Sequence, residues 1–116
     1  MVAYILMLGK VQNFSYSSYC RKIKGASQVV LRQLYGQTFD LVYIDGAHEA
    51  RYVIEDAVLC FPLVQSGGFI LFDDYDFSFK QKSSQNTAVA IDAFVSMFSD
   101  EVTVVERGRQ VLLRKN

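Results

Sequence analysis

Two short apolar runs stand out in the middle of the chain, and each ends in acidic residues. Residues 39–44 (FDLVYI) are followed by Asp45, and residues 69–72 (FILF) are followed by Asp73 and Asp74. Runs of this length that are apolar on both faces are typical of strands buried in a parallel sheet. We therefore predict two strands that each end in a carboxylate.

The segment between these runs predicts a helix over residues 50–64. Its apolar positions recur at helical spacing, and they are Val53, Ala57, Phe61 and Val64. Pro62 is expected to kink or shorten this helix near its end. The glycine pair Gly67-Gly68 then breaks the chain before the second strand. Strand, helix and strand in this order predict a βαβ unit with parallel strands.

The N-terminal third is patterned less clearly. Residues 2–8 (VAYILML) fit either a buried strand or a short helix, and residues 21–24 fit a short strand that ends at Gly25. Ser27 is a suitable N-cap for the helix that follows, and Gly36 is a suitable stop for it.

The C-terminal third predicts one helix and a hairpin. Thr87 can cap a helix whose apolar face runs to Met97. Residues 101–106 and 110–114 read as strands joined by a tight turn, which predicts an antiparallel hairpin. The whole pattern predicts an α/β fold in which a parallel sheet carries an antiparallel C-terminal edge.

Composition narrows the class of protein. The chain has 116 residues, which predicts a single domain over residues 1–116. Its 12 basic and 12 acidic side chains balance, so no strong field favours nucleic acid or an anionic membrane. Residues 2–8 are too short to span a bilayer and lack the flanks of a signal peptide. Cys20 and Cys60 have no metal-binding spacing, which favours a reducing, cytoplasmic location.

The acidic residues suggest a metal site. Ligands bind beyond the carboxyl ends of parallel strands, so Asp45, Asp73 and Asp74 are expected to meet at one end of the sheet if their strands are neighbours. Three carboxylates repel one another, and Mg²⁺ would relieve that repulsion while leaving positions open for substrate oxygens. His48 lies nearby in sequence and would be placed to accept a proton.

Plainer readings of the same residues exist. Asp-Gly after a strand is a common turn, which weakens the case for Asp45 taken alone. Asp73 or Asp74 would equally serve to cap or solvate a loop. A lone histidine such as His48 is more often an ordinary hydrogen-bonded residue than a base. The metal hypothesis therefore depends on the carboxylates being brought together.

Three segments together resemble a known family. FDLVYIDGAH, SGGFILFDDY and KGASQ (residues 24–28) occur in the order and spacing of small-molecule O-methyltransferases. These belong to the class I S-adenosylmethionine-dependent methyltransferases, and the match runs from about residue 22 to residue 116. The resemblance implies the C-terminal portion of a Rossmann-like methyltransferase sheet, S-adenosylmethionine and Mg²⁺ as cofactors, and a small molecule with a hydroxyl group as substrate.

The resemblance also assigns roles by position. Asp45, Asp73 and Asp74 would be the magnesium ligands, and Asp45 would also contribute to cofactor binding. His48 would be the general base. The three remaining candidates would form part of the adenine pocket, and these are Gly25, Ser27 and Gln28. For Ser27, the role in the pocket and the role as a helix cap are compatible.

Two features of that family are not recognisable in the sequence. These are the glycine-rich loop after the first strand and the acidic residue after the second. Gly9 is a lone glycine, and 15 residues separate it from Gly25, too few for two strands and two helices. The family's strand order 3-2-1-4-5-7-6 then leaves residues 39–44 at an exposed edge, unless residues 2–8 fill the gap. An exposed edge favours a homodimer.

Two other readings therefore stay open beside methyl transfer. One is an inactive interaction or structural domain that lacks the cofactor-binding half. The other is a fragment of a longer gene.

Overall fold

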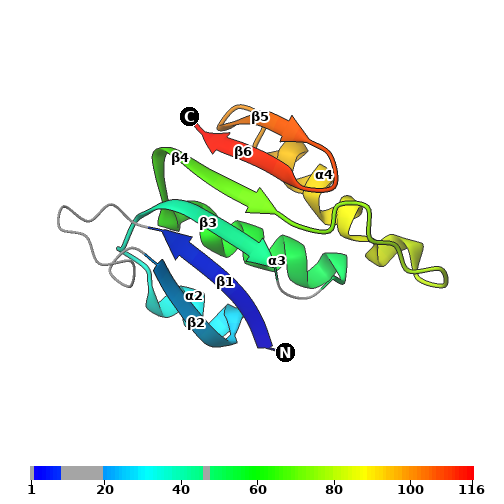
Figure 1. Cartoon of the computed structure of the whole chain (residues 1–116), viewed down its shortest axis with the longest axis horizontal. Coiled ribbons are helices and arrows are strands. Elements are labelled where there is room, and N and C mark those ends of the chain that lie inside the picture. Colours follow the sequence, from blue (N-terminus) through cyan, green and yellow to red (C-terminus); the bar gives the residue numbers. More distant parts are fainter. Residues whose placement is uncertain (1, 9–19, 46–47) are drawn as a thin grey trace.

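A computed structural model describes residues 2–8, 20–45 and 48–116 (Figure 1). The strands form one six-stranded sheet in the order β2-β1-β3-β4-β6-β5. The strands are β1 (Val2–Leu8), β2 (Cys20–Ala26), β3 (Phe39–Asp45), β4 (Val64–Phe72), β5 (Val102–Arg107) and β6 (Val111–Lys115). The helices are α2 (Ser27–Gln33), α3 (Ala50–Cys60) and α4 (Thr87–Met97), with short 3₁₀ turns at Phe61–Leu63 and Ser83–Gln85. The predicted α/β layout is confirmed.

The centre of the sheet is the predicted βαβ unit. Strands β3 and β4 are parallel neighbours, and α3 connects them. The helix ends at Cys60, earlier than predicted, because the backbone tightens into a 3₁₀ turn that contains Pro62. Proline lacks the N–H group that an α-helix needs at an interior position.

The glycine pair lies inside β4, so the prediction that it separates helix from strand is wrong. The register of β3 against β4 shifts between Phe39 and Leu41, and Gly67 has a φ of +83°, a conformation that glycine adopts without strain. A Cβ atom on Gly68 would lie 2.9 Å from the carbonyl oxygen of Asp40. The two glycines therefore let β4 continue through an irregular stretch beside β3.

The N-terminal segment is a strand, and it occupies the place beside β3. Strand β1 pairs antiparallel with both β2 and β3, with Tyr4 opposite Asp45 and Leu8 opposite Leu41. It stands between β2 and β3, where the resembled order has strands two and one. The exposed edge expected at residues 39–44 is therefore not present. The outer strands of the sheet are β2 and β5.

Both predicted N-caps are wrong. The N-cap residues are Ala26 and Asn86, and neither makes a side-chain capping bond. The Ser27 hydroxyl instead donates to Asp56 of α3, and the Thr87 hydroxyl donates to the carbonyl oxygen of His48. In both cases a tertiary partner takes the hydroxyl that a local cap would use, so these two residues connect separate elements.

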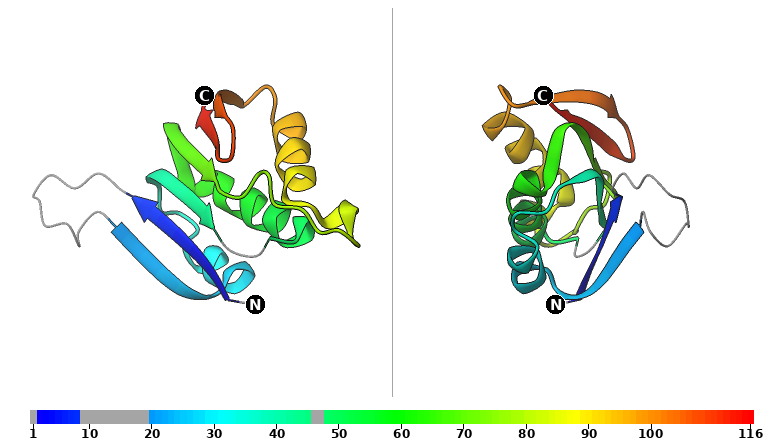
Figure 2. Two further views of the ribbon diagram at one scale, coloured as in Figure 1. Left: turned by 45° about the vertical axis from the view of Figure 1, so that its right-hand side comes forward. Right: turned by 90° about the vertical axis from the view of Figure 1, so that its left-hand side faces the viewer.

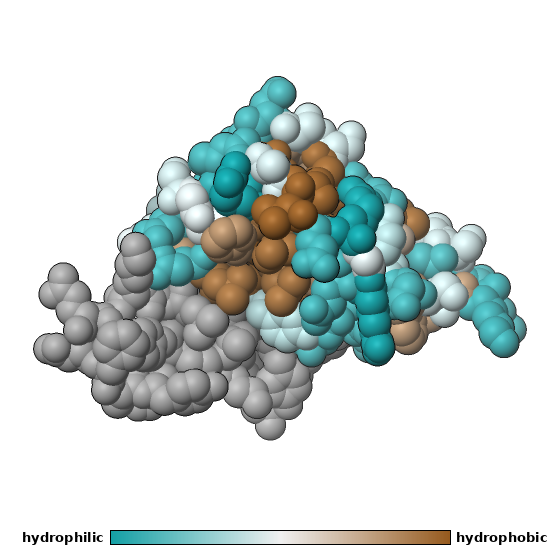
Figure 3. All heavy atoms as spheres, turned by 45° about the horizontal axis from the view of Figure 1, so that its top comes forward, coloured by the Kyte–Doolittle hydropathy of each residue, from teal (hydrophilic) through white to brown (hydrophobic). Residues whose placement is uncertain are grey.

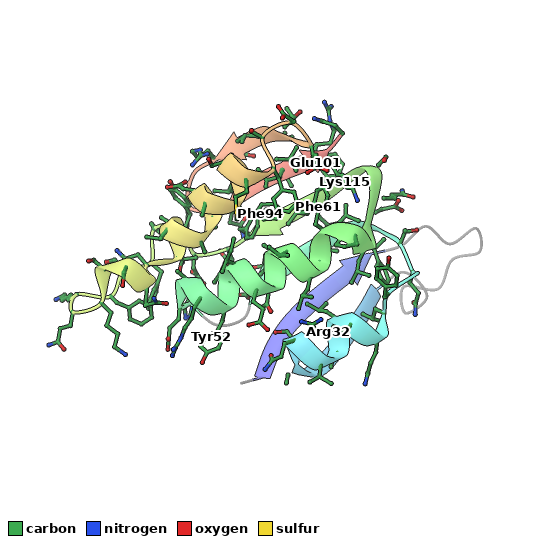
Figure 4. The ribbon with its side chains drawn as sticks, turned by 180° about the vertical axis from the view of Figure 1, so that it is seen from behind. Arg32, Tyr52, Phe61, Phe94, Glu101 and Lys115 are labelled. Carbon is green, nitrogen blue, oxygen red and sulfur yellow. The ribbon has the colours of Figure 1, made fainter. Side chains whose placement is uncertain are left out.

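All three α-helices cover one face of the sheet, as the side view in Figure 2 shows. The core lies between these layers and includes the fully buried Phe72 and Phe94, whose ring centroids are 5.8 Å apart. Lys115 lies at one end of this core. Its Nζ atom donates to the carbonyl oxygens of Phe61 and Val64 and lies over the Phe61 ring (Figure 4).

The other face of the sheet carries no helix in the described part of the chain. An apolar patch is visible in Figure 3, and a wide groove of about 790 Å³ runs over this face. The floor of the groove is formed by half-buried side chains of β3, β4 and β6, and these are Leu41, Phe69, Leu71 and Leu112. Side chains alternate along a strand, so the neighbours Val42, Ile70 and Leu113 point into the core on the opposite face.

The C-terminal hairpin is confirmed. Strands β5 and β6 are antiparallel, and β6 pairs antiparallel with β4. The hairpin turn brings Arg109 and Gln110 back beside the end of β4, where the backbone N–H of Tyr75 donates to the carbonyl oxygen of Arg109. None of the helices in the described ranges has the length and hydrophobicity that a membrane span requires.

Candidate metal and cofactor site

Three carboxylates meet at one end of the two parallel strands. Asp45 is the last residue of β3, and Asp73 and Asp74 follow β4 directly. One ligand oxygen from each lies within 4.8 Å of the others. In an octahedral Mg²⁺ site with bonds of about 2.1 Å, ligand oxygens lie about 2.9–4.2 Å apart. Side-chain adjustments of under about 1 Å would therefore bring these oxygens onto one cation.

Asp73 is the most firmly held of the three. Its Oδ2 atom accepts a 2.5 Å hydrogen bond from the Tyr43 hydroxyl, and its Oδ1 atom accepts a 2.8 Å bond from the backbone N–H of Asp74. Gln110 adds a long contact of 3.5 Å to Oδ1. The Tyr43 hydrogen bond is the main cause of a lowered pKa at Asp73, because hydrogen bonds to a carboxylate favour its charged form.

Asp45 is perturbed in the opposite direction. Burial is the main cause of its raised pKa, and the charges of Asp73 and Asp74 raise it further. The same burial and the hydrogen bond to Asp73 raise the pKa of the Tyr43 hydroxyl well above its ordinary value. A divalent cation would remove the repulsion among the carboxylates. The donor set is therefore chemically suited to such an ion.

Asp74 has an unusual backbone that turns it toward His48. Its φ is +59°, in the left-handed region that aspartate tolerates better than most residues. The turn is closed by a 3.0 Å hydrogen bond from the Phe77 N–H to the Asp74 carbonyl oxygen. This conformation accompanies a 2.9 Å contact between Oδ2 of Asp74 and Nε2 of His48.

His48 is fixed from three sides. Besides Asp74, it contacts Phe77, whose ring stacks on the imidazole at a centroid distance of 4.2 Å. Its carbonyl oxygen accepts the 2.9 Å hydrogen bond from Thr87. The side chain is still 42% exposed, so it is open to a ligand. When Nε2 donates to Asp74, Nδ1 is the nitrogen that can accept a proton.

The predicted adenine-pocket residues lie at the same end of the sheet but not in the cluster. Val2 pairs with Ala26 and Tyr4 with Asp45, so the start of β1 separates the end of β2 from the end of β3. Gly25 is the next-to-last residue of β2, and Ser27 and Gln28 open α2. The structure thus brings the four metal and base candidates together, Asp45 included, and leaves the other three cofactor candidates two strands away.

Ser27 is bound to a residue that sequence reasoning missed. Its hydroxyl donates to the carboxyl group of Asp56, which is 2% exposed. Burial raises the Asp56 pKa to about 6. Its burial could have been predicted from helical spacing, since Asp56 follows Val53 by three residues and therefore lies on the core-facing side of α3. Tyr43 was missed in the same way. It precedes Asp45 by two positions, so strand periodicity puts both on one face.

The direction of β1 differs from the one that a glycine-rich cofactor loop after the first strand would need. If β1 were parallel to β3, it would end beside Asp45, and the loop after it would start near the carboxylates. Here β1 is antiparallel, and its last residue, Leu8, pairs with Leu41 at the opposite end. Gly9 itself lies outside the described residues. The strand that precedes it therefore does not lead toward the carboxylate cluster.

Comparisons with known proteins agree with this geometry. The family model described as "Methyltransferase domain" matches residues 8–75, more than half of the chain. A relative in the curated proteins, an uncharacterized protein of Acanthamoeba polyphaga mimivirus, is 47% identical over 36 residues, which is 31% of this chain and 16% of that protein.

Solved O-methyltransferase structures share the fold. The structure of the O-methyltransferase NovP has a TM-score of 0.52 and 18% identity over 69% of this chain and 31% of its own. The MycE methyltransferase from the mycinamycin biosynthetic pathway, in complex with Mg and SAH, has a TM-score of 0.61 and 16% identity over 83% of this chain and 33% of its own. A MycE complex that also holds mycinamycin VI gives a TM-score of 0.60 at 17% identity, over 83% of this chain and 32% of that one.

The chain spans about a third of the length of these solved structures. The family model extends through residue 75 and therefore includes all three carboxylates. We conclude that the chain belongs to the S-adenosylmethionine-dependent methyltransferase family.

Proposed function

We propose that this chain is the part of an O-methyltransferase that contains the metal ligands and the general base. Its substrate would be a small molecule with a hydroxyl group. The observation that supports this most directly is the convergence of Asp45, Asp73 and Asp74 within 4.8 Å, with His48 bonded to Asp74. The solved relatives NovP and MycE are O-methyltransferases, and the MycE complexes hold Mg and SAH.

Each residue of the cluster has a role in this proposal. Asp45, Asp73 and Asp74 would hold Mg²⁺, which when bound lowers the pKa of a hydroxyl group at its open positions. His48 would accept the proton of that hydroxyl at Nδ1, while Asp74 fixes the orientation of the ring through Nε2. Phe77, stacked on the imidazole, would keep water from that face of the base. The methyl group would come from the sulfonium of S-adenosylmethionine.

The cofactor side of the proposal rests on fewer residues. Gly25, Ser27 and Gln28 lie at the same end of the sheet as Asp45 and would contact the adenine end of S-adenosylmethionine. The Ser27 hydroxyl already donates to Asp56, so it would offer its oxygen lone pairs to the adenine amino group. The described residues contain no glycine-rich loop for the methionine end.

Calorimetric titration of the purified chain tests both halves of the proposal. Mg²⁺ should bind with a stoichiometry of one, and Asp45→Asn combined with Asp73→Asn should abolish the binding. Asp100→Asn is the matched control, because Asp100 is exposed and remote from the cluster in the fold. S-adenosylhomocysteine should bind more tightly with Mg²⁺ present. If neither ligand binds to a chain that melts cooperatively, the proposal is wrong.

A structural or interaction role is the second candidate, and the position of β1 favours it. Strand β1 fills the gap beside β3 in the antiparallel direction, and the apolar groove floor is uncovered in the described part of the chain. A domain of this kind would form a stable oligomer and have no affinity for S-adenosylhomocysteine. Sedimentation equilibrium that shows a monomer, together with cofactor binding, would exclude it.

A further inference from the structure

The hydroxyl group of Tyr43 lies beside the carboxylate cluster. It donates a 2.5 Å hydrogen bond to Oδ2 of Asp73, and one ligand oxygen of Asp73 lies within 4.8 Å of one of Asp45. Tyr43 and Asp45 point to the same face of β3, whereas Asp73 comes from the neighbouring strand β4. One phenol therefore links the two strand ends that supply the acidic residues.

The partners of Asp73 leave it little freedom. Oδ2 is held by Tyr43, and Oδ1 is held by the backbone of Asp74 and, at longer range, by Gln110. A carboxylate oxygen has two lone pairs, so Oδ2 of Asp73, which accepts one hydrogen bond, keeps a lone pair for a cation. Without the Tyr43 bond, Asp73 could rotate away from Asp45, and the repulsion between the two carboxylates would favour that rotation.

We infer that Tyr43 is a positioning residue for the metal site, because its hydroxyl holds Asp73 at a spacing from Asp45 that one divalent cation can bridge. This inference rests on the proposed function. Hydrogen-bond partners that orient the ligands of a metal commonly change its affinity by about 10–100-fold. The aromatic ring of Tyr43 is not needed for this role, so phenylalanine should keep the packing and lose the effect.

The experiment compares Mn²⁺ affinity in two tyrosine variants of the full chain. Mn²⁺ replaces Mg²⁺ as the probe, since its electron paramagnetic resonance signal separates free from bound ion. Tyr43→Phe should weaken Mn²⁺ binding about tenfold or more and should change the spectrum of the bound ion. The control is Tyr35→Phe, because Tyr35 is 80% exposed and lies at the end of α2. That variant should bind Mn²⁺ like the parent chain.

A second variant covers the case in which Tyr43→Phe does not fold. Tyr43→His keeps a ring that can donate to Asp73, so it should retain part of the affinity that phenylalanine loses. Equal Mn²⁺ affinities for the parent chain and a cooperatively folded Tyr43→Phe would overturn the role of Tyr43 and leave the metal site standing. No Mn²⁺ binding by the parent chain would overturn the proposed metal site, and the inference with it.

Discussion

The Nε2 atom of His48 lies 2.9 Å from the Oδ2 atom of Asp74, so the one histidine of the chain is joined directly to the carboxylate cluster. The two residues are 26 positions apart and come from the loops after two neighbouring strands. A cation bound at Asp74 would therefore change the electronic environment of the imidazole.

The first prediction concerns His48 and uses the fact that the chain has one histidine. A ¹⁵N spectrum of the imidazole should show Nε2 carrying the proton, because Asp74 accepts from it. Addition of Mg²⁺ should shift both ring signals, and Asp74→Asn should reduce that shift. Asp76→Asn is a suitable control, since Asp76 is exposed. If the imidazole ¹⁵N signals do not shift at a saturating Mg²⁺ concentration, Asp74 is not a ligand of the ion.

The second prediction concerns the buried Asp56. Its pKa is raised from 3.8 to about 6 in the folded chain, so folding favours the protonated carboxyl group. This contribution to stability is fully present at pH values below the pKa of the unfolded chain and is lost as pH rises through about 6. The free energy of unfolding should therefore fall by about 2–3 kcal/mol between pH 4 and pH 8 from this group.

Asp56→Asn should remove this pH dependence, since an amide does not titrate. Urea unfolding of both chains at pH 4, 6 and 8 measures it. The free energy of unfolding of Asp56→Asn should increase relative to that of the parent chain as pH rises. A difference in free energy of unfolding that stays constant over this range would show that Asp56 titrates normally. Asp100→Asn, on the surface, should leave the parent's profile unchanged.

The third prediction separates two glycines in β4. Gly68→Ala should destabilise the chain by about 1–3 kcal/mol, because the new Cβ would lie 2.9 Å from two carbonyl oxygens and from Val64. Gly67→Ala meets nothing within 4 Å and should cost about 1 kcal/mol for its positive φ. Gly108→Ala is the control, with its nearest atom at 4.0 Å. Thermal and urea denaturation give the ranking, and equal losses at Gly67 and Gly68 would contradict it.

The fourth prediction concerns Lys115. Its ammonium group donates to the carbonyl oxygens of Phe61 and Val64 at 2.9 and 2.7 Å and lies 4.2 Å from the centre of the Phe61 ring. Hydrogen bonds from a charged donor are each worth about 1.5–3 kcal/mol. The amide of glutamine can still donate to one of the two oxygens, so Lys115→Gln should lower the free energy of unfolding by about 2 kcal/mol. Lys82→Gln, at an exposed site, should change it by less than about 0.5 kcal/mol. Urea denaturation of the two variants measures the difference.

The βαβ unit, the C-terminal hairpin and the end of the sheet at which the acidic residues gather could all be predicted from the amino-acid sequence. Apolar runs such as residues 39–44 and 69–72 are readable because strand burial on two faces leaves a continuous pattern. The ends of parallel strands then place Asp45, Asp73 and Asp74 together, since adjacent strands lie only about 4.8 Å apart. Family membership followed from the same segments, because their order and spacing were specific as a set.

The hydrogen-bond partners of Ser27 and Thr87 and the direction of β1 could not be predicted from the sequence, because they depend on tertiary contacts. Ser27 and Thr87 have the sequence context of helix caps, yet they bond to Asp56 and to the His48 backbone, because a partner from another element competes with local capping. Strand β1 pairs antiparallel with β3, and no local pattern fixes the direction of a strand whose neighbours are distant in sequence. The bond from Tyr43 to Asp73 likewise spans 30 residues. It exists only because two strands meet side by side.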